Sequence, residues 1–419
     1  MPSPTIRLLH FADVHFGVEN YGRFDPDSGM NSRLVDFREA LKKAIRIAID
    51  SDVEIAIFSG DAYKTRDPNQ THQREFAACL SMLTSEGIPV VMLAGNHDIP
   101  NTKGRANAIE IFGALAGHQV HVIDSPDVRV LTTSKGNTIQ VAGMPYLIKS
   151  LILSREEYKD KGVQDTTALV VDRYSAGINM LATKCDATLP TVLMGHFSVN
   201  NARLSANQVG YLTNEPEVPL SVLTQAPFDY VALGHIHRFQ DLNKGQQPPV
   251  VYSGSVERID FGEKNEEKGV CIVDLAKGDA VVKHVVVPTR PFIEIEADVT
   301  ESGEEPTEKL LEAIGRQSIE NAVVKISYRI KSEQLPYLRD PDIRSALEAA
   351  FMIVAIHKDI VRDTDAVRSK LLTESLDPLQ ALGTYFDTRE TLKDRKDELL
   401  GYAEPLLREL ESEESVLGA

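Results

Sequence analysis

Five short clusters of residues that commonly bind metal ions are spread along the first 240 positions of this 419-residue chain. Carboxylate oxygens, an amide oxygen and imidazole nitrogens form a mixed ligand set, which favours Mn²⁺, Fe²⁺ or Zn²⁺ over Mg²⁺ and Ca²⁺. The clusters therefore predict a site for divalent metal ions, provided that the fold brings them together. They are Asp13-Val14-His15, Gly60-Asp61, Gly95-Asn96-His97-Asp98, Gly195-His196 and Gly234-His235-Ile236-His237.

Each cluster directly follows an apolar run with the length of a buried strand. Because side chains at the carboxyl ends of parallel strands meet in one crevice of an α/β sheet, we expect the five clusters to converge. Asp13 and His15 share a face if their strand continues, and both could reach one ion once it has ended in a loop. The five runs are Ile6 to Ala12, Val53 to Ser59, Pro89 to Ala94, Thr191 to Met194 and Tyr230 to Leu233.

This ligand set is sufficient for two metal ions, and two ions together suit phosphodiester hydrolysis. Ions about 3.5–4 Å apart supply a nucleophile and neutralise charge on the phosphoryl oxygens. A carboxylate must contact both ions, and Asp61 is the natural candidate because it stands alone after its strand. Asn96 offers a neutral carbonyl oxygen to one ion, and His235 and His237 repeat the spacing of Asp13 and His15.

Composition limits the class of protein. The formal charge of −17 argues against a protein that coats nucleic acid, since such binding depends on Lys and Arg releasing counterions. Two divalent ions would reverse the local charge, so DNA stays open as a substrate. The three cysteines are far apart, which argues against disulfides or a cysteine-zinc site. We expect a cytoplasmic protein, because no apolar run approaches the roughly 20 residues of a membrane span and no signal peptide is recognisable.

The pattern along the chain predicts three parts. Residues 1–288 alternate strand-like runs with amphipathic helices such as Leu34 to Asp50 and Gln70 to Glu86, and become strand-rich in their second half. This pattern suits a four-layer α/β/β/α sandwich. Residues 289–360 read as a small α/β domain, in the order strand, helix, strand, helix, strand. Residues 361–419 read as a linker and two helices, the first opened by Pro378 and the second over Leu392 to Leu410.

In this order, the five clusters resemble those of the calcineurin-like metallophosphoesterase superfamily. The resemblance implies that His97 binds no metal but acts on the scissile phosphate or the leaving group. It also implies two ions that share Asp61, with one ligand set for each: Asp13, His15, Asp61 and His237 for one, and Asp61, Asn96, His196 and His235 for the other.

Two segments outside the clusters, His10 to Gly17 and Tyr252 to Glu263, resemble the SbcD branch of that superfamily, the nuclease subunits of bacterial SbcCD complexes. The resemblance implies a nucleoid-associated, Mn²⁺-dependent nuclease that degrades double-stranded DNA ends and nicks hairpins. It further implies a capping, DNA-binding role for residues 289–360 and docking of residues 361–419 on the coiled coil of an SbcC-type ATPase with ABC heads. A homodimer would form through a helix within Asn101 to Ala116.

Several alternatives stay open at this stage. Archaeal and eukaryotic relatives carry a catalytic histidine three residues after the shared aspartate, where this chain has Lys64, which could contact a phosphate. The loop from Arg258 to Glu263 could contact DNA or the ATPase, or could be a solvated turn. The chain could also be a small-molecule or nucleotide phosphoesterase with its last 130 residues as a regulatory lid, or a non-catalytic scaffold for the ATPase.

Overall fold

The computed structural model describes residues 5–100, 102, 104–115, 119–149, 163–212, 215–361, 378–387, 392 and 394–417. The chain divides into two compact units. The first contains Met1–Glu294, Gln317–Lys325 and Leu347–Ala355, and the second contains Ile295–Arg316, Ile326–Ala346 and Ile356–Ala419. In the described part of the chain, no helix combines the length and the apolar character that crossing a membrane requires.

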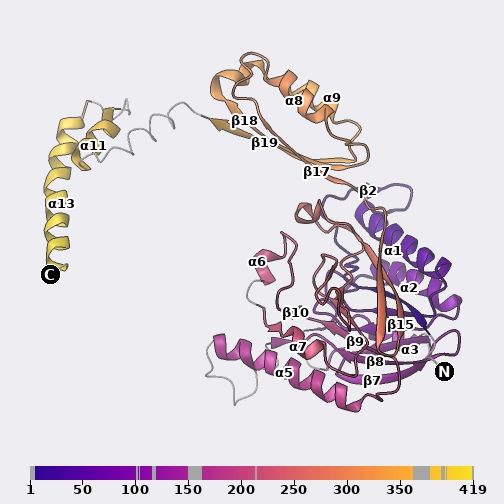
Figure 1. Cartoon of the computed structure of the whole chain (residues 1–419). Coiled ribbons are helices and arrows are strands. Elements are labelled where there is room, and N and C mark those ends of the chain that lie inside the picture. The colour runs from indigo at the N-terminus through magenta and orange to yellow at the C-terminus, as the bar shows by residue number, and fades with distance from the viewer. Residues whose placement is uncertain are drawn as a thin grey trace. The chain divides into compact units, whose positions relative to one another are not determined.

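Two six-stranded sheets form the centre of the first unit (Figure 1). The first sheet has the order β16-β15-β1-β4-β5-β6 and is parallel from β1 to β6. The second has the order β13-β14-β12-β9-β8-β7 and is parallel from β14 to β8. The strands of the first sheet are β1 (Ile6–Phe11), β4 (Ile55–Phe58), β5 (Val90–Leu93), β6 (Val120–Ile123), β15 (Gly269–Ala276) and β16 (Asp279–Val286). Those of the second are β7 (Asp127–Thr132), β8 (Thr138–Met144), β9 (Thr191–His196), β12 (Tyr230–Gly234), β13 (Gln240–Asp241) and β14 (Val250–Tyr252).

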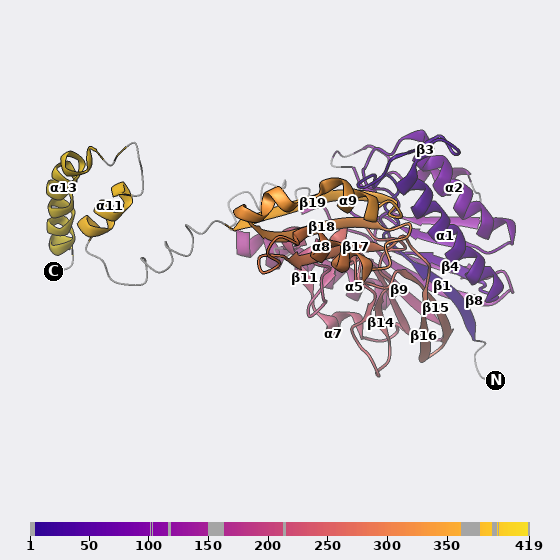
Figure 2. The ribbon, with the colours of Figure 1, turned by 90° about the horizontal axis from the view of Figure 1, so that it is seen from above.

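Helices cover the outer faces of both sheets, with α1 (Ser32–Asp50) and α2 (Gln70–Ser85) on one side and α5 (Val163–Lys184) on the other (Figures 1 and 2). Separate apolar clusters fill the space between the sheets and the space under each helical layer. Side chains alternate between faces along a strand, so Leu8 packs between the sheets whereas Leu9 packs under α1. The predicted four-layer α/β/β/α sandwich is confirmed.

The two predicted helices of the first unit begin at asparagine caps. The Asn31 side chain accepts a hydrogen bond from the backbone of Arg33 at the start of α1, and Asn69 caps α2 in the same way. Smaller elements complete this unit: β2 (Phe24–Asp25), β3 (Met30–Asn31), α3 (Glu110–Leu115), β10 (Ser198–Val199), α6 (Val209–Leu212), β11 (Glu217–Val218), α7 (Leu220–Leu223) and the 3₁₀ turn η3 (Phe261–Glu263).

Two features of this unit differ from the sequence-based expectation. Helix α5 was not predicted, although Val170, Tyr174 and Ile178 recur at helical spacing and are buried. Among the described residues, the helix expected within Asn101 to Ala116 is limited to α3, since residues 104–109 form turns and loop. Phe112 of α3 packs into the core. Residues 101, 103 and 116 lie outside the described part.

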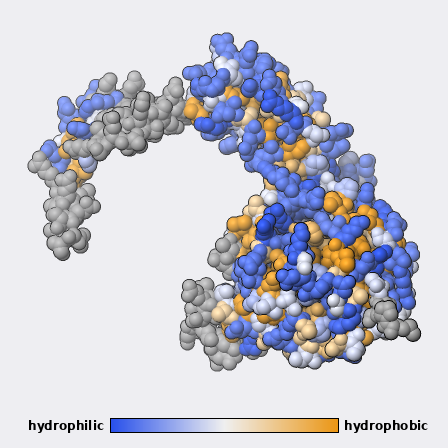
Figure 3. Space-filling model, viewed as in Figure 1, coloured by the Kyte–Doolittle hydropathy of each residue, from blue (hydrophilic) through white to orange (hydrophobic). Residues whose placement is uncertain are grey.

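The sheet of the smaller α/β region has the strand order β17-β18-β19, and each strand contributes residues to both units. The strand and helix order along the chain is the predicted one. Figure 3 shows a mainly hydrophilic surface over the second unit, interrupted by apolar residues. The elements are β17 (Phe292–Asp298), α8 (Pro306–Gly315), β18 (Val323–Lys331), the 3₁₀ turn η4 (Ser332–Tyr337), α9 (Asp340–Ala346) and β19 (Met352–Val361).

Two helices follow in the last part of the chain, α11 (Pro378–Asp387) and α13 (Lys396–Leu417), and they contact each other. Pro378 opens α11 as predicted, whereas α13 begins four residues after the predicted Leu392. The predicted linker falls largely on residues 362–377, outside the described residues. The functional boundaries at 288 and 360 stay predictions.

Candidate metal centre

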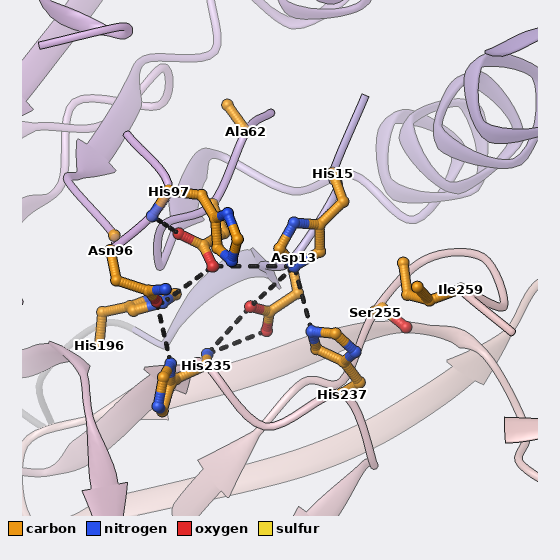
Figure 4. Close-up of polar contacts among 12 residues, drawn as sticks. Asp13, His15, Ala62, Asn96, His97, His196, His235, His237, Ser255 and Ile259 are labelled. Atoms are coloured by element: carbon orange, nitrogen blue, oxygen red, sulfur yellow. Dashed lines mark hydrogen bonds and ion pairs between the residues drawn. The ribbon is translucent and has the colours of Figure 1, made fainter. Parts of the chain in front are cut away.

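The structure brings the residues of all five clusters together at the carboxyl ends of β1, β4, β5, β9 and β12 (Figure 4). Among the candidate ligands, His196 is the last residue of β9, and the others lie in the loops that follow their strands. Ligand atoms in three groups approach within 4.8 Å of one another: Asp13, His15 and His237; His15, Asp61 and His97; and Asp13, Asp61 and His196.

Four of the site residues adopt left-handed backbone conformations, with φ of 51° at Asp13, 49° at His15, 61° at Asp61 and 96° at His235. Such conformations cost on the order of 1–3 kcal/mol each in residues other than glycine, and they concentrate at functional sites. The Asp13 amide donates to the carbonyl of Gly60 at 2.9 Å, which joins the loops after β1 and β4. Strand β1 has therefore ended before Asp13, and a loop directs Asp13 and His15 to the same point.

Two glycines of the clusters allow this close approach. A Cβ atom on Gly95 would lie 2.2 Å from Oδ1 of Asp61. Gly60 has a φ of +97°, and a Cβ there would lie 2.4 Å from Nδ1 of His196. A larger residue at either position would displace a candidate ligand, which explains why glycine precedes the aspartate and the asparagine.

The hydrogen bonds of His196 leave acceptor atoms facing one another. Its Nδ1 lies 2.7 Å from the carbonyl oxygen of Ser59 and donates to it, so Nε2 is the nitrogen that can bind a metal ion once it has lost its proton. That Nε2 lies 3.0 Å from Oδ1 of Asn96 and 3.3 Å from Oδ2 of Asp61. Three acceptors directed at one point require a cation between them, either a proton or a metal ion.

His235 and His237 repeat this arrangement with carboxylates as their partners. Nε2 of His235 lies 2.6 Å from Glu215, which leaves Nδ1 as an acceptor 3.0 Å from Oδ1 of Asn96. Nδ1 of His237 lies 2.8 Å from Glu263, which leaves Nε2 facing Nε2 of His15 at 3.1 Å. Metal-binding histidines almost always donate their second N–H to a carboxylate or a carbonyl in this way.

The donor set therefore fits two divalent ions on either side of Asp61. Oδ2 of Asp61 lies 3.7 Å from Nε2 of His15 and 3.3 Å from Nε2 of His196, so one carboxylate faces both groups of histidines. Asp13 faces His15 at 3.9 Å, and its carboxylate also accepts from the backbone N–H of His235.

The electrostatics of the centre favour a bound cation. Burial acts to raise the pKa of Asp61, but the neighbouring His196 and His97 hold it well below its ordinary value. Burial raises the pKa of Asp13, because an ionised carboxylate there has lost its water. His196 is buried as well, yet Asp61 raises its pKa to about 9. A divalent ion would supply the positive charge that these two carboxylates share.

His97 differs from the other candidate histidines because its ring is partly exposed. Its Nδ1 donates to the carbonyl of Lys64 at 2.8 Å, and its backbone N–H donates to Oδ1 of Asp61 at the same distance. The ring lies 5.0 Å from that of His15. This position is next to the ligands and open to solvent on one side, as a group that acts on substrate requires.

Three carboxylates that hold the centre in place were not predicted from the sequence. Asp98 accepts from the backbones of Asp61 (2.8 Å) and Gly95 (3.0 Å), and Glu215 and Glu263 orient the two histidines after β12. Asp98 lies within a recognised cluster and Glu263 within a segment already compared with nucleases, so a signal existed for both. For Glu215, which no motif surrounds, there was none.

The interpretation of Arg258 to Glu263 as a solvated turn is wrong. Glu263 is buried and forms a 2.8 Å ion pair with the buried Lys268, and Lys268 also lies 3.1 Å from the carbonyl of His237. Burial acts to raise the pKa of Glu263, but Lys268 and His237 hold it far below its ordinary value. The turn is part of the support for the metal centre.

Comparisons with known proteins identify the family of this chain. The calcineurin-like phosphoesterase family model matches residues 6–239. The DNA double-strand break repair protein Mre11 of Thermoplasma acidophilum is 26% identical, over 72% of this chain and 71% of its own length. The SbcD subunit of the nuclease SbcCD is 26% identical in both Bacillus subtilis and Escherichia coli, over 65% and 70% of this chain and 67% and 72% of those proteins. Because the family model spans more than half of the sequence, the chain belongs to the calcineurin-like phosphoesterases.

Proposed function

We propose that this protein is a metal-dependent DNA nuclease that hydrolyses phosphodiester bonds with two metal ions. The observation that carries the proposal is the set of imidazole nitrogens, amide oxygen and carboxylate oxygens that face one another across Asp61 at 3.0–3.3 Å, where a cation has to lie between them. A phosphoester hydrolase follows from the family. The choice of DNA is supported by relatives named as a DNA double-strand break repair protein and as a subunit of a nuclease.

In this proposal each ligand residue has a defined task. Asp13, His15, Asp61 and His237 bind one ion, and Asp61, Asn96, His196 and His235 bind the other. When bound, the two ions activate water and neutralise charge on the phosphoryl oxygens. His97 places Nε2 at the scissile phosphate, with its ring held by the Lys64 carbonyl, and protonates the leaving oxygen or stabilises the transition state.

The finer assignments are also part of this proposal. Of Mn²⁺, Fe²⁺ and Zn²⁺, the ions that a mixed oxygen and imidazole ligand set favours, we assign Mn²⁺ as the preferred one, because carboxylate or carbonyl oxygens belong to both proposed ligand sets. Residues 289–360 act as a capping domain on DNA. Exposed Tyr402 and Leu406 of α13, one helical turn apart, support docking on the coiled coil of an SbcC-type ATPase. Exposed Ile111 and Leu115 of α3 support a homodimer.

The test is to incubate the purified chain with Mn²⁺ and three substrates: linear duplex DNA, hairpin DNA and bis(p-nitrophenyl) phosphate. We expect cleavage of both DNAs, and we expect His97→Ala to reduce it by about 10²–10⁴-fold, the range for a lost acid or base. Metal content should be unchanged in this variant. Turnover of the small ester without DNA cleavage would identify a small-molecule phosphoesterase, and inactivity on every substrate would favour a scaffold.

A further inference from the structure

A cavity of about 670 Å³ lies beside the metal centre, with His97 in its wall. Cavities of this size, about 300–1,000 Å³, commonly hold ligands. The side chains of Lys64, Arg66 and Arg105 bring three positive charges to this cavity, against one carboxylate from Asp67. In a chain with a formal charge of −17, this is a local reversal of sign.

The wall of the cavity and the metal centre are connected through the backbone. The carbonyl of Lys64 holds His97 at 2.8 Å, and the Lys64 N–H donates to the carbonyl of Phe16, one residue after His15, at 3.0 Å. If one phosphate of a longer substrate lies at His97, the next part of that substrate therefore lies beside Lys64, in the cavity.

The three cationic side chains in the cavity wall, those of Lys64, Arg66 and Arg105, are available to a ligand. Among the described residues, no carboxylate forms an ion pair with Lys64 or Arg66. Arg105 pairs with Asp67, but both side chains are more than half exposed, and an exposed pair contributes only about 0–1 kcal/mol. A phosphate can replace Asp67 as the partner of Arg105 at little cost.

We propose that this cavity binds the phosphodiester backbone of the substrate strand next to the scissile phosphate. Guanidinium groups match the geometry of phosphate oxygens, and the Lys64 ammonium adds a point charge. The inference deepens the proposed nuclease function and rests on it, because it makes a polynucleotide, rather than a small ester, the preferred substrate.

The experiment measures kcat/KM for linear DNA and for bis(p-nitrophenyl) phosphate over a series of salt concentrations, with Mn²⁺ present. The variants are Arg66→Gln and Arg105→Gln, with Arg105→Lys as the conservative change. Arg129→Gln is the matched control, since Arg129 is also an exposed arginine in an ion pair, 2.8 Å from Asp127. Thermal unfolding checks that all variants are folded.

We expect each glutamine variant to raise KM for DNA about three- to tenfold and to make its salt dependence shallower by about 0.7–0.9 in log–log slope, as for one lost phosphate contact. The ratio of DNA to small-ester kcat/KM should fall by the same factor. Arg105→Lys should keep the wild-type slope, and Asp67→Asn should lower KM for DNA because it removes the opposing charge.

Two results would overturn the inference but leave the proposed nuclease function in place. In the first, the salt dependence of DNA cleavage is the same in Arg66→Gln and Arg105→Gln as in the control Arg129→Gln. In the second, these two variants lose the same factor in kcat/KM on DNA and on the small ester. A wild-type protein that turns over the small ester but leaves DNA intact would instead remove the proposed function, and the inference with it.

Discussion

The two halves of the metal centre are built from the same kinds of residue but are supported differently. At one half, His237 donates to Glu263, whose side chain is 0% exposed and is paired with the buried Lys268. At the other, His235 donates to Glu215, whose side chain is 21% exposed. Besides His235, the hydrogen-bond partners of Glu215 in the described part of the chain are hydroxyl groups, those of Ser198 (3.3 Å) and Tyr146 (3.4 Å).

This difference concerns how firmly each histidine is oriented. An ion pair without solvent keeps its geometry, since water cannot compete with it, whereas a partly exposed carboxylate with long hydroxyl contacts can move. We therefore expect the half with Asp13, His15 and His237 to bind its ion more tightly than the half with Asn96, His196 and His235. In a Mn²⁺ titration, the wild type should show two steps, with the weaker step belonging to the second half.

The largest effect is expected from Asp61→Ala, which removes the carboxylate common to both halves. Both ions lose a ligand, so Mn²⁺ content should fall to background and cleavage should fall by at least about 10³-fold, a loss of about 4 kcal/mol in transition-state stabilisation. Metal analysis together with the nuclease assay measures this. Normal metal occupancy in this variant would contradict the assignment of Asp61 as the shared ligand.

The next effect is expected from Glu263→Gln. The tighter step of the Mn²⁺ titration should weaken about 10–100-fold, the usual result of removing the partner of a metal-binding histidine. The variant should also lose about 2 kcal/mol in the free energy of unfolding, because the buried Lys268 loses its 2.8 Å contact with Glu263 and keeps only Glu266, at 2.9 Å, as a carboxylate partner.

The double variant Glu263→Gln with Lys268→Met separates these two contributions. It should recover part of the unfolding free energy, because the buried ammonium that lost its contact with Glu263 is gone, but it should leave the tighter step as weak as in the single variant. Recovery of both quantities together would show that Glu263 supports only folding and has no role in orienting His237.

The fold and the position of the candidate ligands could be predicted from the sequence, but the residues that support these ligands could not be predicted to the same extent. The five clusters could be recognised because each lies at the end of an apolar strand, and four of them begin with glycine. At Gly60 and Gly95 this glycine is required, because His196 and Asp61 lie too close to the backbone for a larger residue. The acidic residues that orient His235 and His237 could not be recognised from local spacing in the sequence. Glu215 is 20 residues from its partner His235 and Glu263 is 26 from His237, and no local spacing indicates which acidic residue will turn inward.

A smaller effect than that of Glu263→Gln is expected from Glu215→Gln. Only the weaker step of the titration should change, by about tenfold, because His235 loses its charged acceptor while His237 is untouched. The burial of Glu215 acts to raise its pKa, but the hydrogen bond from His235 keeps it below the ordinary value. No buried cation depends on Glu215 among the described residues, so the free energy of unfolding should change by less than about 1 kcal/mol.

Equal weakening of both steps in Glu215→Gln would remove the distinction between the two halves. The electron paramagnetic resonance signal of a coupled Mn²⁺ pair gives an independent measurement. The signal of the coupled pair should be lost in Glu215→Gln at Mn²⁺ concentrations that fill only the tighter half, the one with His237. The spectrum of a single Mn²⁺ ion should replace it.

The smallest effect is expected from Tyr146→Phe, which tests whether the hydroxyl contacts matter to the weaker half. The phenol donates to Glu215 over 3.4 Å, near the limit for a hydrogen bond, while its ring packs beside His235. Removing the hydroxyl keeps the ring and should cost about 0.5–1 kcal/mol, a two- to fivefold weakening of the second step. A tenfold change would mean that Tyr146 holds Glu215 as firmly as Lys268 holds Glu263, and the two halves would then be supported equally.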